Sequence, residues 1–229
     1  MILQAVEVTK VYETRGVTTH ALDGVSLQMD EGEFSAIAGP SGSGKTTLLN
    51  LLGALDTPTS GNVLLDGEEL TTLDSAALAG LRLHKLGFVF QSYNLIPVLS
   101  ACENVEFVMD LQGVEAGERK QRAREVLERV GLSGLEDKRP PEMSGGQQQR
   151  VAGARAIASR PRLVLADEPT ANLDSDTAKR LLELMAELNQ VEGITFLFST
   201  HDPLVMEAAQ RVVRLRDGRV VDDGAGNHG

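Results

Sequence analysis

The sequence predicts an α/β fold whose mostly parallel sheet is buried on both faces. Three short apolar or β-branched segments, 86–90, 163–166 and 195–198, lack the polar alternation of half-exposed strands, which is typical of buried parallel strands. A helical segment long enough to connect two parallel strands follows the second of them. From 174 to 189 its apolar residues recur at the spacing i, i+3, i+4 and i+7, behind Asp174 as the helix N-cap.

The first predicted strand, 33–38, runs directly into a phosphate-binding motif. Residues 39–46 read Gly-Pro-Ser-Gly-Ser-Gly-Lys-Thr, a full match to G-x-x-x-x-G-K-[ST], and a helix is predicted to follow. The glycines let backbone N–H groups turn inward around a β-phosphate, Lys45 supplies charge, and the Thr46 hydroxyl is offered to Mg²⁺. A Gly/Ser surface loop, the alternative, rarely matches this pattern between a strand and a helix. We therefore predict a P-loop NTPase core of the RecA-like class that binds a nucleotide through Gly39, Ser41, Gly42, Ser43, Gly44, Lys45, Thr46 and Thr47.

Antiparallel strands and an inserted helical region are predicted around this core. The dipeptides Asp66-Gly67 and Asp217-Gly218 stand between extended segments, as tight hairpin turns do. From about residue 95 to 160 the sequence is mostly helical, and 118–130 carries one apolar stripe among Arg and Glu. We expect one nucleotide-binding domain with its α/β core over 1–91 and 161–229 and an α-helical subdomain over 92–160. Residues 224–229 are expected to form a frayed tail.

Composition restricts the partners and the compartment. There are 22 Lys and Arg against 33 Asp and Glu, a formal charge of −11, which disfavours binding to nucleic acid or anionic lipid. The single cysteine, Cys102, cannot form an internal disulfide, and the N-terminus does not read as a signal peptide. No apolar run approaches the ~18 to 20 residues that cross a bilayer. We therefore expect a cytoplasmic chain that contacts a membrane only through a partner.

Two adjacent carboxylates end the strand predicted at 163–166. Asp167 would hold Mg²⁺ through water, as acids at this position do in P-loop proteins. Glu168 lies one residue further, where it can orient the water that attacks the γ-phosphate or accept a proton from it. Alone, Asp-Glu-Pro at a strand end is more typical of a polar turn. After a complete phosphate loop, the pair favours the metal and general-base roles.

A second anion-binding helix start is predicted at 144–147, before a helix that continues to residue 158. Ser144 can cap this helix, and its hydroxyl with the Gly145 and Gly146 amides would form an anion-binding end. A capped helix after the Pro140-Pro141 turn would also explain the pattern. Because the chain already has one phosphate cradle, the second helix start needs either another ligand or another molecule.

Taken together, these motifs resemble the ATP-binding subunits of ABC transporters over essentially the whole chain. Residues 143–147 correspond to the LSGGQ signature of that family, with Met143 in place of Leu. The resemblance implies ATP hydrolysis by a homodimer in which the signature of one subunit closes on ATP held by the phosphate loop of the other. It also implies an integral membrane permease as partner, and hence a peripheral location on the inner face of the cell membrane.

The resemblance assigns roles to four further residues. Gln91 matches the loop that senses Mg²⁺, water and the membrane partner, and His201 matches the γ-phosphate switch. Asp174 lies in the loop that crosses the dimer, and Tyr12 matches the aromatic that stacks on adenine. By residue type alone, each is an ordinary strand-end or rim residue. The implied catalytic residues are Glu168, His201 and Gln91; the implied metal ligands are Thr46, Gln91 and Asp167; the implied ATP contacts from the other copy are Ser144, Gly145, Gly146, Gln147 and Asp174.

Within the family, segments 12–22, 52–61 and 87–105 are similar to the lipoprotein-releasing LolD and macrolide-export MacB branch. This implies export or lipoprotein release, with the permease expected to dock near 91–103. The alternative is an FtsE-like ATPase that regulates a membrane partner without transporting a substrate. Gly153 departs from the family pattern, which favours a branched residue there.

Overall fold

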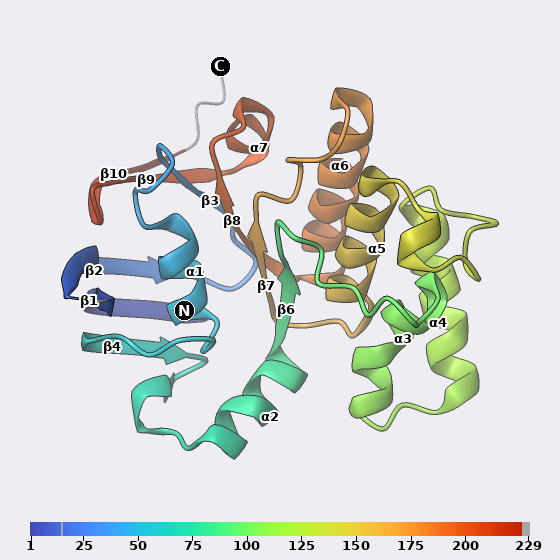
Figure 1. The fold of residues 1–229 in the computed structure, drawn as a ribbon, viewed down its shortest axis with the longest axis horizontal. Helices are drawn as coiled ribbons and strands as arrows, with labels where there is room; N and C mark the ends of the chain where they lie inside the picture. Colours follow the sequence, from blue (N-terminus) through green and yellow to red (C-terminus); the bar gives the residue numbers. More distant parts are fainter. Residues whose placement is uncertain (15, 226–229) are drawn as a thin grey trace.

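The computed structural model describes residues 1–14 and 16–225, and it confirms the α/β class (Figure 1). The central sheet has six strands in the order β10-β9-β3-β8-β7-β6. All neighbours are parallel except β10, which is antiparallel to β9. Its strands are β3 (Phe34–Ala38), β6 (Leu86–Val89), β7 (Leu163–Asp167), β8 (Thr195–Thr200), β9 (Arg211–Arg216) and β10 (Arg219–Ala225).

A second, antiparallel sheet flanks this core in the order β2-β1-β4-β5. Both predicted hairpin turns are confirmed: Asp66-Gly67 joins β4 to β5, and Asp217-Gly218 joins β9 to β10. All four of these residues have positive φ, between 49° and 77°, as a type I′ turn requires. The strands are β1 (Leu3–Thr14), β2 (Val17–Met29), β4 (Ser60–Leu65) and β5 (Glu68–Glu69).

The side chains of the central sheet alternate between two apolar cores. Ile37, Leu165 and Leu197 face a core shared with α1 (Lys45–Leu52) and the antiparallel sheet. Phe34 and Phe198 face the opposite core, with their ring centroids 4.8 Å apart. Because successive strand residues point to opposite faces, β3, β7 and β8 are buried throughout. Figure 1 shows α1 between the two sheets and α5 and α6 on the far side of the central one.

Three helices lie between β6 and β7, where the sequence predicts helical structure. The helix expected at 118–130 is α4, which begins two residues earlier. The Asp174 cap is also confirmed, since its Oδ1 accepts from Thr177 N at 3.0 Å. The helices and short 3-10 turns are α2 (Ser75–Lys85), α3 (Ala101–Leu111), α4 (Ala116–Arg129), α5 (Gly145–Ala158), α6 (Ser175–Glu192), α7 (Pro203–Ala208), η1 (Leu70–Thr72) and η2 (Pro140–Glu142). Of the helices in the described ranges, none has the length and apolarity to span a membrane.

The prediction of a frayed C-terminal tail is wrong for its first two residues. Gly224 and Ala225 belong to β10, because Ala225 pairs with Arg211 and Gly224 with Val212 of β9. Pairing with a neighbouring strand therefore extends two residues past the point where Gly-rich composition indicates fraying. The rest of the predicted tail, 226–229, lies outside the described residues.

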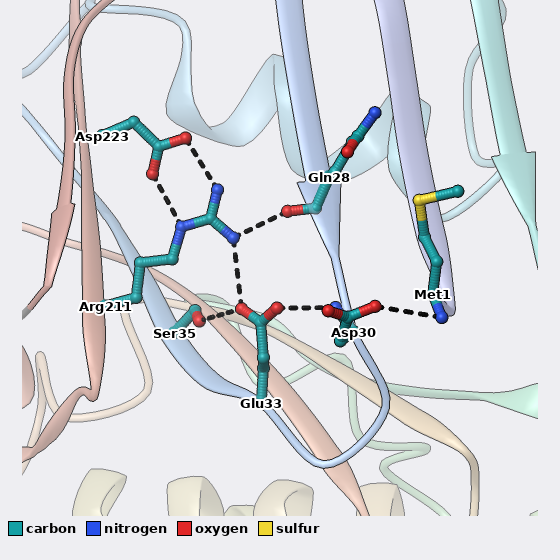
Figure 2. Close-up of polar contacts among 7 residues, drawn as sticks. All are labelled: Met1, Gln28, Asp30, Glu33, Ser35, Arg211 and Asp223. Carbon is teal, nitrogen blue, oxygen red and sulfur yellow. Dashed lines mark hydrogen bonds and ion pairs between the residues drawn. The ribbon is translucent and has the colours of Figure 1, made fainter.

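An ion-pair cluster ties the antiparallel sheet to the central one (Figure 2). Arg211 of β9 forms two hydrogen bonds with the carboxylate of Asp223 on β10, at 2.6 and 2.7 Å. The same guanidinium donates to the Gln28 carbonyl of β2 at 2.7 Å and to Glu33 at 3.2 Å. The Asp223 carboxylate raises the pKa of Arg211. The cluster therefore joins β2, β9 and β10 at the start of β3.

Substituting Gly153 by alanine is expected to stabilise the fold. A Cβ at Gly153 would lie 3.5 Å from Leu181 and 3.9 Å from Met185 of α6, which is ordinary van der Waals contact. Because glycine inside a helix costs about 1 kcal/mol relative to alanine, Gly153→Ala should raise the free energy of unfolding by about that amount in urea titrations. Gly80→Ala is the matched control, since a Cβ there meets nothing within 4 Å. A loss of stability confined to Gly153→Ala would contradict this packing.

Candidate active site

The phosphate loop connects β3 to α1 and brings its backbone very close to neighbouring strands. A Cβ at Gly39 would lie 2.1 Å from the Leu215 carbonyl oxygen, and one at Gly44 2.5 Å from that of Ala21. Gly44 also has a φ of 101° and is the N-cap of α1, whose first turn has no side-chain cap among the described residues. These positions therefore accept only glycine, and the N–H groups at the start of α1 are available to an anion.

Lys45 lies at the start of α1 and is buried. Its Nζ donates to the carbonyl oxygens of Gly39 at 2.7 Å and Pro40 at 3.1 Å, so the ammonium lies across the loop. The Ser43 hydroxyl is buried and has no hydrogen-bond partner in the described part of the chain. The loop therefore combines a fixed positive charge with polar groups that can bind phosphate oxygens.

Two of the three residues predicted to hold Mg²⁺, Thr46 and Asp167, lie in contact. Thr46 Oγ1 donates to Asp167 Oδ2 at 2.9 Å, although 121 positions separate the two residues in sequence. The other carboxylate oxygen, Oδ1, is buried and has no hydrogen-bond partner within the described ranges. No group of three or more His, Cys, Asp and Glu arranged as a metal site occurs in those ranges. Hard oxygen donors in this small number fit Mg²⁺, which takes one or two carboxylates together with phosphate oxygens and water.

Glu168 and His201 are brought together by neighbouring strands. Glu168 follows β7 and His201 follows β8, and His201 Nδ1 lies 2.7 Å from Glu168 Oε1. Thr200 Oγ1 donates to the other oxygen at 3.4 Å. Glu168 has a φ of 48°, an uncommon conformation for a residue with a side chain, and is 8% exposed. Strained backbone at a buried acid is typical of functional sites.

The pairing of β6 with β7 places Gln91 near Asp167 and Glu168, but its side chain does not bind them. The last paired residue of β6, Val89, lies beside Ala166 of β7, so the chain leaves the sheet next to the two carboxylates. Gln91 is exposed. In the described ranges, no hydrogen bond joins its side chain to Asp167 or Glu168.

The second helix start is built as the sequence predicts. Gln147 N donates to Ser144 Oγ at 3.3 Å, and Ser144 N donates to Gln147 Oε1 at 2.9 Å, which is a capping box. The structure does not place it beside the phosphate loop, because α5 and α1 pack on opposite faces of the central sheet. It lies instead beside the loop before α6, where a Cβ at Gly146 would be 3.3 Å from Leu173.

Asp174, at the end of that loop, is also separate from the phosphate loop. Hydrogen bonds from Thr177 lower the pKa of its carboxyl group. It therefore caps α6 as a carboxylate.

Tyr12 lies at the end of β1, where residues that the sequence analysis missed hold it in place. Its hydroxyl donates to Asp56 Oδ2 at 2.9 Å, and Lys10 Nζ lies 4.9 Å from the centre of its ring. Lys10 also donates to Asp56 at 2.7 Å. Burial, and then the Asp56 hydrogen bond, raises the pKa of the Tyr12 phenol. The spacing i, i+2 places Lys10 and Tyr12 on the same face of a strand, and this signal is available in the sequence. Their shared contact with Asp56 cannot be read from the sequence.

A further hydrogen-bonded pair that the sequence analysis did not predict joins the loop after β7 to the loop after β8. Thr170 Oγ1 donates to Asp202 Oδ2 at 2.7 Å, and Asp202 N donates to Thr200 Oγ1 at 2.9 Å. The first bond connects the loop after Glu168 to the loop that carries His201, and the second holds Asp202 against the last residue of β8.

Comparison with known proteins gives consistent matches. The family model described as ABC transporter matches residues 22–171. An uncharacterized ABC transporter ATP-binding protein of Thermotoga maritima is 51% identical over 219 residues, covering 96% of this chain and 93% of that protein. The macrolide export ATP-binding/permease protein MacB of Syntrophobacter fumaroxidans is 45% identical over 219 residues, but the match covers only 31% of its length.

Two solved structures match over the full length of both chains. Both are of the ATP-binding cassette MJ0796, with a TM-score of 0.95 and 41% identity. One is described as a dimeric post-hydrolysis state bound to ADP and Pi, and the other as a dimeric bacterial ABC transporter cassette.

Proposed function

Because this chain belongs to the ABC transporter family and is an ATP-hydrolysing cassette, we propose that two copies close head to tail around two ATP·Mg²⁺ and drive a membrane permease. One observation carries the proposal. The glycine-containing helix starts at Lys45 and at Ser144 lie on opposite faces of the central sheet, and the Thr46–Asp167 hydrogen bond brings a carboxylate to the one at Lys45. The start at Ser144 is therefore available to the nucleotide of a second copy, and the solved cassettes named above are dimeric.

At each nucleotide, the residues of one chain have separate roles. Lys45 and the α1 amides bind the phosphates, and Thr46 and Asp167 would hold Mg²⁺, which neutralises charge on the phosphate oxygens when bound. Glu168 accepts a proton from the attacking water or orients it, and His201 fixes the Glu168 carboxylate through their 2.7 Å contact. Tyr12 presents its ring to adenine at the far end of the site.

The second copy contributes the rest of each site. Ser144, Gly145, Gly146 and Gln147 would contact the γ-phosphate across the interface, with Asp174 beside them, so closure depends on ATP. Gln91 joins the site to the helices between β6 and β7, and we assign residues 92–160 to a subdomain that moves with it. Hydrolysis then removes the ligand that holds the dimer closed.

The docking site for the permease is a groove of about 380 Å³ between α2 and α3. Its lining includes Leu55, which is 43% exposed, and Phe107, which is 38% exposed. Phe88 and Phe90 stack in the same groove with their centroids 5.6 Å apart. Exposed apolar side chains in a concave surface mark an interaction site. The docking segment predicted from sequence, 91–103, contributes Asn94 to this lining.

The MacB relative supports an export permease. Lipoprotein release is the other transport function that we propose, and the FtsE-like regulator is the alternative. The test is to purify the chain from detergent-solubilised membranes with the proteins bound to it. We expect an integral membrane permease, and Phe107→Glu should lose it while retaining ATP hydrolysis. A permease that encloses a substrate path supports transport, whereas one that only relays force to an extracytoplasmic enzyme supports regulation. Recovery of no membrane protein would contradict the proposal.

A further inference from the structure

Arg155, in the last turn of α5, binds the backbone of the loop that follows β6. Its Nη1 donates to the Asn94 carbonyl oxygen at 2.6 Å, and its Nη2 donates to that of Tyr93 at 3.0 Å. Tyr93 and Asn94 are adjacent residues with φ of 60° and 48°. Left-handed backbone is unfavourable for residues with a side chain and persists where the surroundings hold it. The guanidinium of Arg155 is one of the groups that hold this turn.

The two hydrogen bonds stabilise the positive charge of Arg155 in a partly buried position. The side chain is half-buried, and burial lowers the pKa of its guanidinium. No carboxylate forms an ion pair with it within the described ranges, and the two carbonyl oxygens are its hydrogen-bond partners there. A desolvated cation depends strongly on such partners. The planar guanidinium binds the two carbonyls through two different nitrogens held at a fixed spacing, whereas a lysine side chain is shorter and presents a single nitrogen.

The same turn also contacts the other end of α5. The Tyr93 hydroxyl oxygen lies 2.9 Å from the position that a Cβ would take on Gly145, the first residue of the helix. Ser144 and Arg155 are separated by about three helical turns. The 93–94 turn is therefore attached to a rigid helix near its signature end, through Tyr93, and near its C-terminal end, through Arg155.

We propose that Arg155 is a positioning residue that links the loop carrying Gln91 to the signature helix α5. A shift of the 93–94 turn moves α5 as a body, and Ser144 and Gly146 move with it. Asn94 and Arg155 both line the groove between α2 and α3, so a partner docked there meets this link. The inference rests on the proposed assembly of each ATP site from two copies.

The test measures MgATP-driven dimerisation by analytical ultracentrifugation, in a Glu168→Gln background that slows hydrolysis. Arg155→Lys keeps the charge but replaces the two-nitrogen fork by one nitrogen on a shorter side chain, and we expect dimerisation to weaken about tenfold through loss of one charge-assisted hydrogen bond. The affinity of the monomer for MgATP should not change, since the phosphate loop lies on the other face of the sheet. Tyr93→Ala removes the second attachment and should weaken dimerisation in the same direction.

Arg119→Lys is the matched control. Arg119 is a half-buried arginine of α4 that donates to the Val114 carbonyl at 3.1 Å and does not contact the 93–94 turn. Arg119→Lys should leave MgATP-driven dimerisation unchanged. If the Glu168→Gln parent does not dimerise with MgATP, the proposed function fails. If the parent dimerises and Arg155→Lys dimerises equally well, or weakens only in proportion to lost MgATP affinity, the positioning role of Arg155 is overturned.

Discussion

Replacing Glu168 by glutamine is expected to lower the rate of ATP hydrolysis by about 10² to 10⁴, because the amide cannot accept a proton from the attacking water. The substitution keeps the size of the side chain. In the natural chain, Glu168 Oε1 lies 2.7 Å from His201 Nδ1, and glutamine can keep this contact. ATP binding should therefore be retained, since Lys45 and Thr46 are untouched. Steady-state phosphate release and MgATP binding, measured on the same preparation, separate the two effects.

Glu207→Gln is the control for this prediction. Glu207 is an exposed carboxylate of α7, close to His201 in sequence, so its loss changes charge without changing the site. Its rate should equal that of the natural chain. Unchanged hydrolysis in Glu168→Gln would remove Glu168 from the role assigned to it.

Much of the core could be predicted because local chemistry determines it. The strands at 163–166 and 195–198 consist of apolar or β-branched residues, and the structure buries them on both faces. The Asp174 cap and the Asp-Gly turns depend on residues that are adjacent or nearly adjacent in sequence. The phosphate loop belongs to the same class, since its motif is one continuous stretch, 39–46, although the close contacts of its glycines with Leu215 and Ala21 appear only in the structure.

The contacts that organise the site could not be predicted in this way, because they join distant segments. Arg155 reads as an ordinary polar helix residue, yet its partners lie 61 and 62 positions away. The left-handed turn at Tyr93 and Asn94 contains no glycine that would indicate it. The Asp56 contact of Tyr12 spans 44 positions. Periodicity and motifs carry no information about such pairs, which depend on how the strands are ordered in the sheets.

Variants of Lys45 and Ser144 should distinguish the roles of the two halves of the active site. Both Lys45→Ala and Ser144→Arg are expected to lower hydrolysis by about 10² or more, as losses of phosphate-stabilising donors do. Only Lys45→Ala should abolish MgATP binding by the monomer, because Ser144 lies on the other side of the central sheet from the phosphate loop. Equilibrium binding at low protein concentration measures this difference. Loss of monomer binding in Ser144→Arg would indicate that the signature acts within its own chain.

Mixing the two inactive chains gives the decisive result. In a head-to-tail heterodimer, one site combines the defective phosphate loop of the first chain with the defective signature of the second. The other site combines the intact Lys45 of the Ser144→Arg chain with the intact Ser144 of the Lys45→Ala chain, so the mixture should hydrolyse ATP faster than the sum of its components. Adding a second Ser144→Arg preparation in place of the Lys45→Ala chain should restore nothing. If each chain formed a complete site alone, neither mixture could recover activity, because every site would keep its own defect.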